Sequence, residues 1–140
     1  MATKAEISKF VKSQKSIWLY RKVQKAFEDV LSSMSDEDYR EATEGLYLMV
    51  LHESALGQLM HFPRSKGKFK ILQLSIATKA PDYILRYVIA HELGHGMQKR
   101  NWKKSDKGRL EASADAWAKK WGFPRDEKVE KWMNAVTKPL

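Results

Sequence analysis

The sequence predicts an α+β fold that forms a single domain over residues 1–140, with helices at the amino-terminal end, a small sheet in the middle and further helices after it. Three observations predict this arrangement. Long stretches near both ends carry apolar residues at helical spacing, whereas three short apolar segments between residues 46 and 75 are separated by turn-forming residues. A chain of 140 residues with 43% hydrophobic residues can bury one core, and its longest apolar run, residues 46–51, is far shorter than the roughly 20 residues of a membrane-spanning helix.

The amino-terminal stretch over residues 3–33 contains no glycine or proline, and its apolar residues recur at helical spacing. It predicts one long helix or two helices in succession. Ser35 is followed by three acidic residues, which is typical of a helix cap with favourable charges in the first turn. We therefore expect a short helix that runs toward Thr43 and ends at Gly45.

Three segments that cover residues 46–52, 56–62 and 69–75 are short, apolar and separated by turn-forming residues. They predict a small sheet of three strands, or a larger one, in which consecutive strands pair as a meander. An alternative stays open for the first part, because residues 46–60 also fit a buried helix.

A helix is predicted from Pro81, which fits a first helical position, to about Gln98, and Asp82 complements its amino end. Residues 100–108 are basic and polar and predict a loop. Residues 109–123 predict a further helix, which Gly122 and Pro124 stop, and residues 126–136 predict a last short helix.

The helix after Pro81 contains His91-Glu92-Leu93-Gly94-His95. Four residues are about one helical turn, so both imidazoles project from one face and Glu92 lies beside them. A stripe of apolar residues leads to the histidines and predicts that this face packs inward; its members are Ile84, Leu85, Val88 and Ile89. Buried histidines and a buried carboxylate need partners, and a divalent cation would supply one. The motif is therefore half of a zinc site.

A catalytic zinc ion usually has three protein ligands, and the chain contains no cysteine, so the third ligand must be a histidine or a carboxylate. The candidates that follow the motif are Asp106, Glu111 and Asp115. Glu111 begins a helix that is predicted to pack inward through Ala112, Ala116, Trp117 and Trp121. Asp115 lies one turn later on the same face, where it could accept the outer N–H of a zinc-bound imidazole. We expect His91, His95 and Glu111 to bind one zinc ion per chain.

The two motifs, His91 to His95 and Glu111-Ala112-Ser113-Ala114-Asp115, resemble the gluzincin metallopeptidases, and the small size is similar to minigluzincins and related phage-type peptidases. The resemblance implies a minimal zincin-like domain with an active-site helix and a ligand helix, and a zinc-dependent endopeptidase that acts on peptide or protein substrates. Glu92 would be the general base and acid. The resemblance also implies that the strand at residues 69–75 pairs with the substrate. No counterpart was found for the oxyanion-stabilising Tyr or His of many members.

Other residues have plainer interpretations. His52 and His61 are interpreted as ordinary strand histidines rather than oxyanion donors. Four tryptophans are interpreted as packing residues rather than a ligand site; they are Trp102, Trp117, Trp121 and Trp132. Gly94 and Gly96 predict a close approach of backbone or substrate, and Gly96 also fits the end of the helix.

The net charge of +9 is concentrated in residues 62–121, which carry 14 basic and 5 acidic side chains. The densest run comprises Lys99, Arg100, Lys103, Lys104, Lys107 and Arg109. The plain interpretation of this run is a solvated loop. The alternative is a DNA-associated or regulatory protein. In it, residues 64–120 contact nucleic acid, and a metallopeptidase-like fold acts as a binding module. A third hypothesis is an enzyme made latent by its own terminal segments.

The absence of cysteine is compatible with a reducing compartment, and the charged start of the chain does not resemble a secretory signal peptide. We therefore expect a cytoplasmic protein that does not contact a membrane. The oligomeric state does not follow from the sequence.

Overall fold

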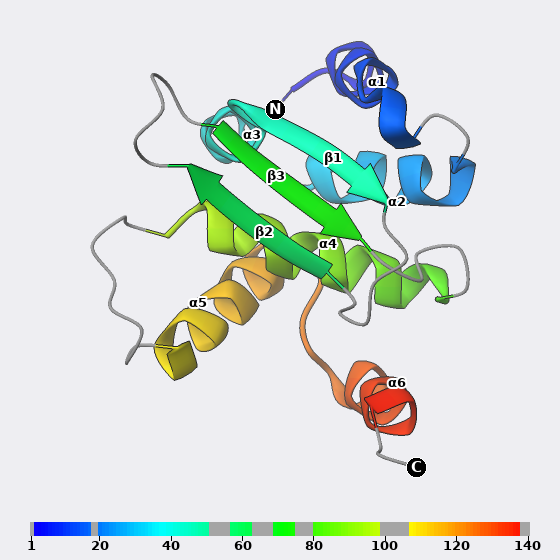
Figure 1. Cartoon of the computed structure of the whole chain (residues 1–140), viewed down its shortest axis with the longest axis vertical. Helices are drawn as coiled ribbons and strands as arrows, with labels where there is room; N and C mark the ends of the chain where they lie inside the picture. The colour runs from blue at the N-terminus through cyan, green and yellow to red at the C-terminus, as the bar shows by residue number, and fades with distance from the viewer. Residues whose placement is uncertain are drawn as a thin grey trace.

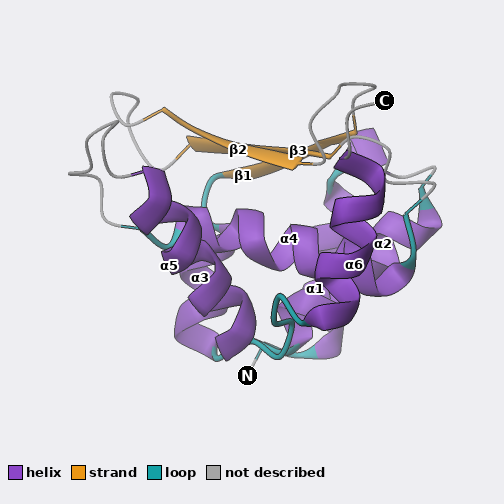
Figure 2. Cartoon of the chain, turned by 90° about the horizontal axis from the view of Figure 1, so that it is seen from below, coloured by secondary structure: helices purple, strands orange, loops and turns teal. Residues whose placement is uncertain are grey.

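The structure is a computed structural model of the chain, and it describes residues 2–17, 20–50, 57–62, 69–74, 80–98 and 107–137. A sheet forms one layer, and the helices lie together on one of its faces (Figures 1 and 2). Among the described residues, no helix is long and apolar enough to cross a membrane.

Two helices in succession form the amino-terminal part, which confirms one of the two predicted alternatives. They are α1 (Lys4–Ser13) and α2 (Arg21–Ser32), with a short 3-10 helix, η1 (Lys15–Ile17), between them. A third helix, α3 (Asp36–Thr43), begins after Ser35, whose side chain accepts a hydrogen bond from the backbone of Asp38 at 3.2 Å. Gly45 follows it with a φ of 67°, a conformation that glycine adopts without strain.

Three strands form the sheet as predicted, but not as a meander. They are β1 (Leu46–Val50), β2 (Gly57–Phe62) and β3 (Phe69–Leu74), in the order β1-β3-β2. β3 pairs with β1 in parallel and with β2 in antiparallel orientation. The strand in the central position therefore comes last along the chain.

Burial explains why β3 occupies the centre of the sheet. Leu72 and Leu74 are completely or almost completely buried between the sheet and the helices. Lys70 is buried as well, and its ammonium group donates to the carbonyl oxygens of Glu41 at 2.7 Å and Ala42 at 3.1 Å, near the end of α3. This interaction satisfies helix-end carbonyls and holds β3 next to β1.

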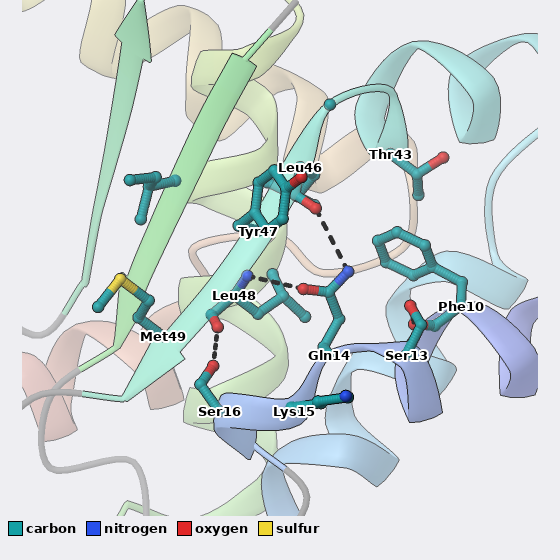
Figure 3. A pocket seen from close by; sticks show the side chains of 12 residues that line it. Phe10, Ser13, Gln14, Lys15, Ser16, Thr43, Leu46, Tyr47, Leu48 and Met49 are labelled. Carbon is teal, nitrogen blue, oxygen red and sulfur yellow. Dashed lines mark hydrogen bonds between the residues drawn. The ribbon is translucent and has the colours of Figure 1, made fainter.

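The outer edge of β1 is closed by side chains from the segment that follows α1 (Figure 3). The amide group of Gln14 donates to the carbonyl of Leu46 at 3.3 Å and accepts from the backbone N–H of Leu48 at 3.0 Å, as a neighbouring strand would. Ser16 donates to the carbonyl of Leu48. The groove beside this edge, which Phe10 and others line, contains no residue of the histidine motif.

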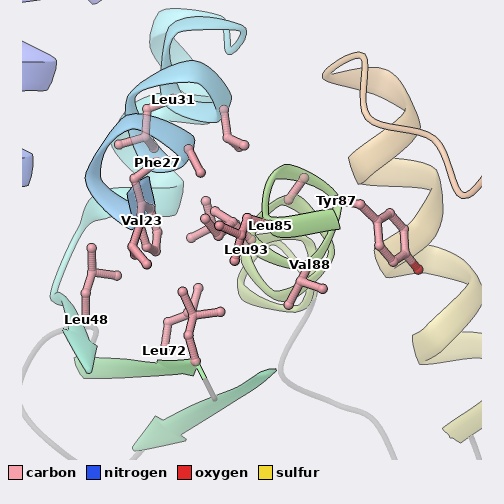
Figure 4. Close-up of a cluster of buried hydrophobic side chains, with 14 of the residues drawn as sticks. Val23, Phe27, Leu31, Leu48, Leu72, Leu85, Tyr87, Val88 and Leu93 are labelled. Carbon is pink, nitrogen blue, oxygen red and sulfur yellow. The ribbon is translucent and has the colours of Figure 1, made fainter. Parts of the chain in front are cut away.

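Helix α4 (Asp82–Gly96) lies under the sheet and carries the histidine motif. It begins one residue after Pro81, which therefore precedes the first helical position instead of occupying it. The predicted apolar stripe of Ile84, Leu85, Val88 and Ile89 is buried, and it packs in the core with side chains of α2 and the sheet (Figure 4). The prediction of an inward-facing stripe is confirmed.

The last two helices are α5 (Lys107–Lys120) and α6 (Glu127–Thr137). The inward-packing face predicted for α5 is right in part: Trp117 packs against the core and Trp121 is buried, but Ala112 and Ala116 are exposed. The buried residues are Ala114 and Ala118, and Trp121 follows them directly after the helix. Small residues occupy this face because α5 packs close to α4, which leaves no room for larger side chains.

Candidate metal centre

The motif on α4 brings three potential ligands together. His91, Glu92 and His95 each offer one ligand atom, and these three atoms lie within 4.8 Å of one another. His91 and Glu92 are buried, and His95 is partly buried. This His-Glu-His group could hold a metal ion, as the spacing of the motif predicts.

Helix α5 approaches this group because Gly94 has no side chain. A β-carbon at Gly94 would lie 2.8 Å from the carbonyl oxygen of Ala114 and 3.1 Å from the β-carbon of Trp117. The two backbones therefore pack at a distance that only glycine allows, as the sequence predicted for this position.

Glu111 on α5 reaches both histidines. Its Oε2 lies 3.0 Å from Nε2 of His91, and its Oε1 lies 3.1 Å from Nε2 of His95. Ligand atoms that are roughly 2.0–2.1 Å from a tetrahedral zinc ion lie about 3.3 Å from one another, which is close to each of these two nitrogen–oxygen distances. The Glu111 side chain remains about half exposed, at 51%, so it is less buried than the predicted inward packing implies.

The other ring nitrogen of His91 contacts Asp115, the residue predicted for this role. Nδ1 of His91 lies 2.7 Å from Oδ1 of Asp115. An ionised carboxylate only accepts hydrogen bonds, so Nδ1 carries the proton and donates. The lone pair that could bind a metal is then on Nε2, which faces Glu111.

The corresponding partner of His95 is Gln98, which the sequence did not single out. Nδ1 of His95 lies 3.1 Å from Oε1 of Gln98, and Nε2 of Gln98 donates to the carbonyl oxygen of Leu110 at 2.6 Å. Because that carbonyl needs a donor, the amide oxygen of Gln98 must face His95, whose Nδ1 therefore donates. Gln98 thus orients His95 and ties the end of α4 to the residue that precedes Glu111.

Tyr87 is a second functional candidate that sequence reasoning missed. Its hydroxyl donates to Oδ1 of Asp115 at 2.6 Å and lies 3.5 Å from Nδ1 of His91. Burial, and then the hydrogen bond to Asp115, raise the pKa of the Tyr87 hydroxyl, while Arg125 opposes the shift. The hydroxyl therefore stays protonated and remains a donor.

The environment of Glu92 suits a group that exchanges protons near neutral pH. Burial raises the pKa of its carboxyl from 4.5 to about 7, and the nearby Glu111 carboxylate adds to the shift. His95 and a hydrogen bond from the backbone N–H of Leu59 act in the opposite direction. A carboxyl whose pKa is near 7 can both accept and release a proton under physiological conditions.

The hydrogen bond from Leu59 identifies the edge of the sheet that adjoins the site. The backbone N–H of Lys70 donates to Gly45 of β1 at 2.9 Å, so Lys70 and Leu72 direct their backbone groups toward β1. Ile71, between them, faces β2, where it is paired with Met60. It follows that the backbone groups of Leu59 point to the outer edge of β2, toward Glu92.

The expectation that residues 69–75 pair with a substrate is therefore wrong. Residues 69–74 form β3, whose two edges are occupied by β1 and β2. A strand with two paired edges has no backbone groups left for a third strand. In the described part of the chain, the strand edge beside the metal centre belongs to β2.

Several sequence-based predictions concern residues outside the described part of the chain: His52, Asp106, Trp102 and the basic residues 99–104. His61 lies in β2, opposite Lys70. Trp117, Trp121 and Trp132 pack against or within the core, which confirms their interpretation as packing residues. Lys107 and Arg109 are exposed at the start of α5, and a role in nucleic-acid contact remains a prediction.

The geometry thus joins the His-Glu-His group on α4 to carboxylates on α5 and to the outer edge of β2. Comparison of the chain with protein-family models, with curated proteins and with solved structures found no match.

Proposed function

We propose that the protein is a zinc-dependent peptidase of the gluzincin type, in which His91, His95 and Glu111 bind the ion. One observation carries the proposal: Nε2 atoms of both histidines face the same carboxylate, at 3.0 and 3.1 Å. Both Nδ1 atoms are occupied by acceptors, which leaves the Nε2 lone pairs for a metal. Two imidazoles and one carboxylate are a ligand set that suits zinc and leaves a coordination position open.

The residues divide the catalytic work as follows. A zinc ion bound by the three ligands would lower the pKa of a bound water toward about 7 and polarise the peptide carbonyl. Glu92 is next to His91 in sequence and close to the ligand atoms. We assign it two steps: it takes a proton from the water that attacks the carbonyl carbon, and it passes that proton to the amine nitrogen as the carbon–nitrogen bond breaks.

The surroundings of Glu92 support this role. Its pKa, raised to about 7 in the metal-free chain, would be lowered by a bound cation, which favours the carboxylate form that accepts the proton of the water. The backbone N–H of Leu59 holds the carboxylate from the side of the sheet. Leu59 therefore orients the base, and it does so from the strand at which we expect the substrate to bind.

We infer that a peptide substrate in extended conformation pairs with the outer edge of β2. The N–H of Leu59 points outward to Glu92, so a peptide that paired with the other outward backbone groups of this edge would pass beside the general base. Pairing through backbone groups selects only weakly for particular side chains of the peptide. This favours cleavage of unfolded protein segments, which is an endopeptidase activity, over removal of terminal residues.

The proposal is tested by measuring zinc content and hydrolysis on the same purified samples. We expect about one zinc per chain by elemental analysis and metal-dependent cleavage of an unfolded protein such as casein. Glu92→Gln should keep the fold and the zinc but lose hydrolysis, because the amide cannot accept the proton. His91→Ala and Glu111→Ala should both lose zinc.

The matched control for Glu111→Ala is Glu127→Ala, because Glu127 also lies near the start of a helix and is exposed. It should retain zinc and activity. A Glu92→Gln variant that hydrolyses casein as fast as the unmodified protein would contradict the catalytic role of Glu92. A Glu111→Ala variant that retains a full zinc equivalent would contradict the ligand set.

A further inference from the structure

A chain of hydrogen bonds leads from His91 through Tyr87 to the segment between α5 and α6. Oδ1 of Asp115 accepts from both Nδ1 of His91, at 2.7 Å, and the Tyr87 hydroxyl, at 2.6 Å. Arg125 donates to the same hydroxyl at 3.4 Å, and its guanidinium carbon lies 6.0 Å from the centre of the Tyr87 ring. Glu130 in turn accepts two hydrogen bonds from Arg125, at 2.6 and 3.4 Å.

The position of Tyr87 indicates that its hydroxyl serves the metal centre. The residue lies one turn before His91 on α4 and is only 2% exposed. Its ring points away from the buried aliphatic cluster toward the far side of α4, where α5 packs (Figure 4). A buried position that needed only an aromatic ring would not require a hydroxyl, and the hydroxyl here reaches the carboxylate that binds His91.

The geometry constrains the Asp115 carboxylate more than His91 alone could. A carboxylate held by one hydrogen bond can rotate about its χ2 torsion, which is broad and soft. Two donors from α4 on the same oxygen fix the rotation of that carboxylate, and the carboxylate then fixes the plane of the His91 ring. Arg125 restrains the Tyr87 hydroxyl by donating a hydrogen bond to it.

We propose that Tyr87 and Arg125 are positioning residues of the metal centre: they hold Asp115 so that Nε2 of His91 points at the ion. The segment that precedes α6 thereby contributes to metal affinity although it supplies no ligand. The inference rests on the proposed function, because it assumes that His91 binds the metal. It adds that the ligand geometry depends on a hydrogen-bond chain anchored at Glu130.

The test measures binding of cobalt(II) to the full chain after removal of metal, by its visible absorption and by competition with a chelator. Tyr87→Phe keeps the ring and removes only the hydroxyl. We expect it to weaken cobalt binding about tenfold and to change the visible spectrum, since loss of an outer partner of a ligand typically costs 10–100-fold in affinity. Arg125→Gln should weaken binding less, by about threefold, because its contact with the hydroxyl is longer.

Tyr83→Phe is the matched control. Tyr83 lies one turn earlier on α4, and within the described residues its ring is next to Lys128 of α6, not to the metal centre. It should bind cobalt within about twofold of the unmodified protein and with the same spectrum. The spectrum separates a positioning role from a structural one, because a mere loss of stability does not alter the bands of cobalt that is bound.

The outcomes separate the two proposals. If the unmodified protein binds no cobalt or zinc, the proposed function and this inference both fail. If it binds cobalt but Tyr87→Phe and Arg125→Gln match it in affinity and spectrum, only the inference is overturned. If Tyr87→Phe does not fold, Arg125→Gln decides alone, because Arg125 is at the surface and its substitution leaves the core intact.

Discussion

Gly94 sets the distance between the helix that carries the histidines and the helix that carries Glu111, so Gly94→Ala probes the geometry of the centre directly. The added β-carbon would lie 2.8 Å from the carbonyl oxygen of Ala114, whereas ordinary contacts begin at 3.4 Å. That oxygen belongs to the backbone and cannot rotate away. The two helices would therefore have to separate by about 0.6 Å at this point.

Two opposing effects determine the stability of Gly94→Ala. Alanine favours a helix over glycine by about 1 kcal/mol. Forcing an extra carbon into a packed interface costs about 1–3 kcal/mol. We expect a net loss of about 1 kcal/mol in the free energy of unfolding. Because Glu111 is anchored in α5, we also expect metal affinity to fall about tenfold as its carboxylate moves away from the histidines.

Gly96→Ala is the control, because it lies in the same helix and its β-carbon would meet only ordinary contacts, the nearest at 3.5 Å from Leu59. It should gain about 0.5–1 kcal/mol from helix propensity and keep its metal affinity. Urea unfolding of the metal-free proteins and chelator competition measure both quantities. The reasoning is refuted if Gly94→Ala is as stable as Gly96→Ala and binds metal as tightly as the unmodified protein.

Three further predictions concern pH, a buried carboxylate and the edge of β2. Burial raises the pKa of Glu92 from 4.5 to about 7, so between these pH values the folded metal-free protein holds a proton that the unfolded chain has released. The contribution of Glu92 to stability should be fully present below pH 4.5, and up to about 3 kcal/mol of it should be lost as pH rises from 4.5 to 7. Urea titrations at several pH values should show this slope, and Glu92→Gln should lack it. Asp38→Ala should lower the free energy of unfolding by about 1–3 kcal/mol, because the buried indole N–H of Trp121 donates to Asp38 at 3.0 Å and would lose this acceptor. The control is Glu37→Ala at an exposed position, which should change the free energy of unfolding little. Leu59→Pro removes the N–H that contacts Glu92 and leaves the pairing of β2 with β3 intact. Zinc should therefore stay bound, and casein hydrolysis should fall at least tenfold. Unchanged hydrolysis would show that this hydrogen bond is dispensable.

The helices and the main residues of the candidate metal centre could be predicted because their patterns lie within short stretches of sequence. Helical spacing alone places His91 and His95 on one face, and the same argument places Glu111 and Asp115 one turn apart. The structure brings these residues into contact across two helices, with Nε2 of His91 and His95 both near Glu111. The helix cap at Ser35 could also be predicted from the residues adjacent to it.

The parts that could not be predicted depend on contacts between distant segments. The order of the strands is set by burial of β3 and by the interaction of Lys70 with α3, neither of which has a local pattern. Gln98 and Tyr87 are ordinary helix or loop residues until the fold brings them to Leu110 and Asp115. Ala112 and Ala116 were misplaced because alanine is common on exposed and buried helix faces alike.

The closed edge of β1 has a consequence for self-association. Gln14 and Ser16 occupy the carbonyl of Leu46 and both backbone groups of Leu48 there, so a foreign strand would extend the sheet more readily beside β2, at whose outer edge no described strand pairs. A second copy of the chain that docked by strand addition would therefore sit where we expect the peptide to bind. If the proposed function holds, dimers or fibrils that grow through this edge would be inactive. A peptide bound at this edge would block such growth, so peptide ligands should also slow aggregation.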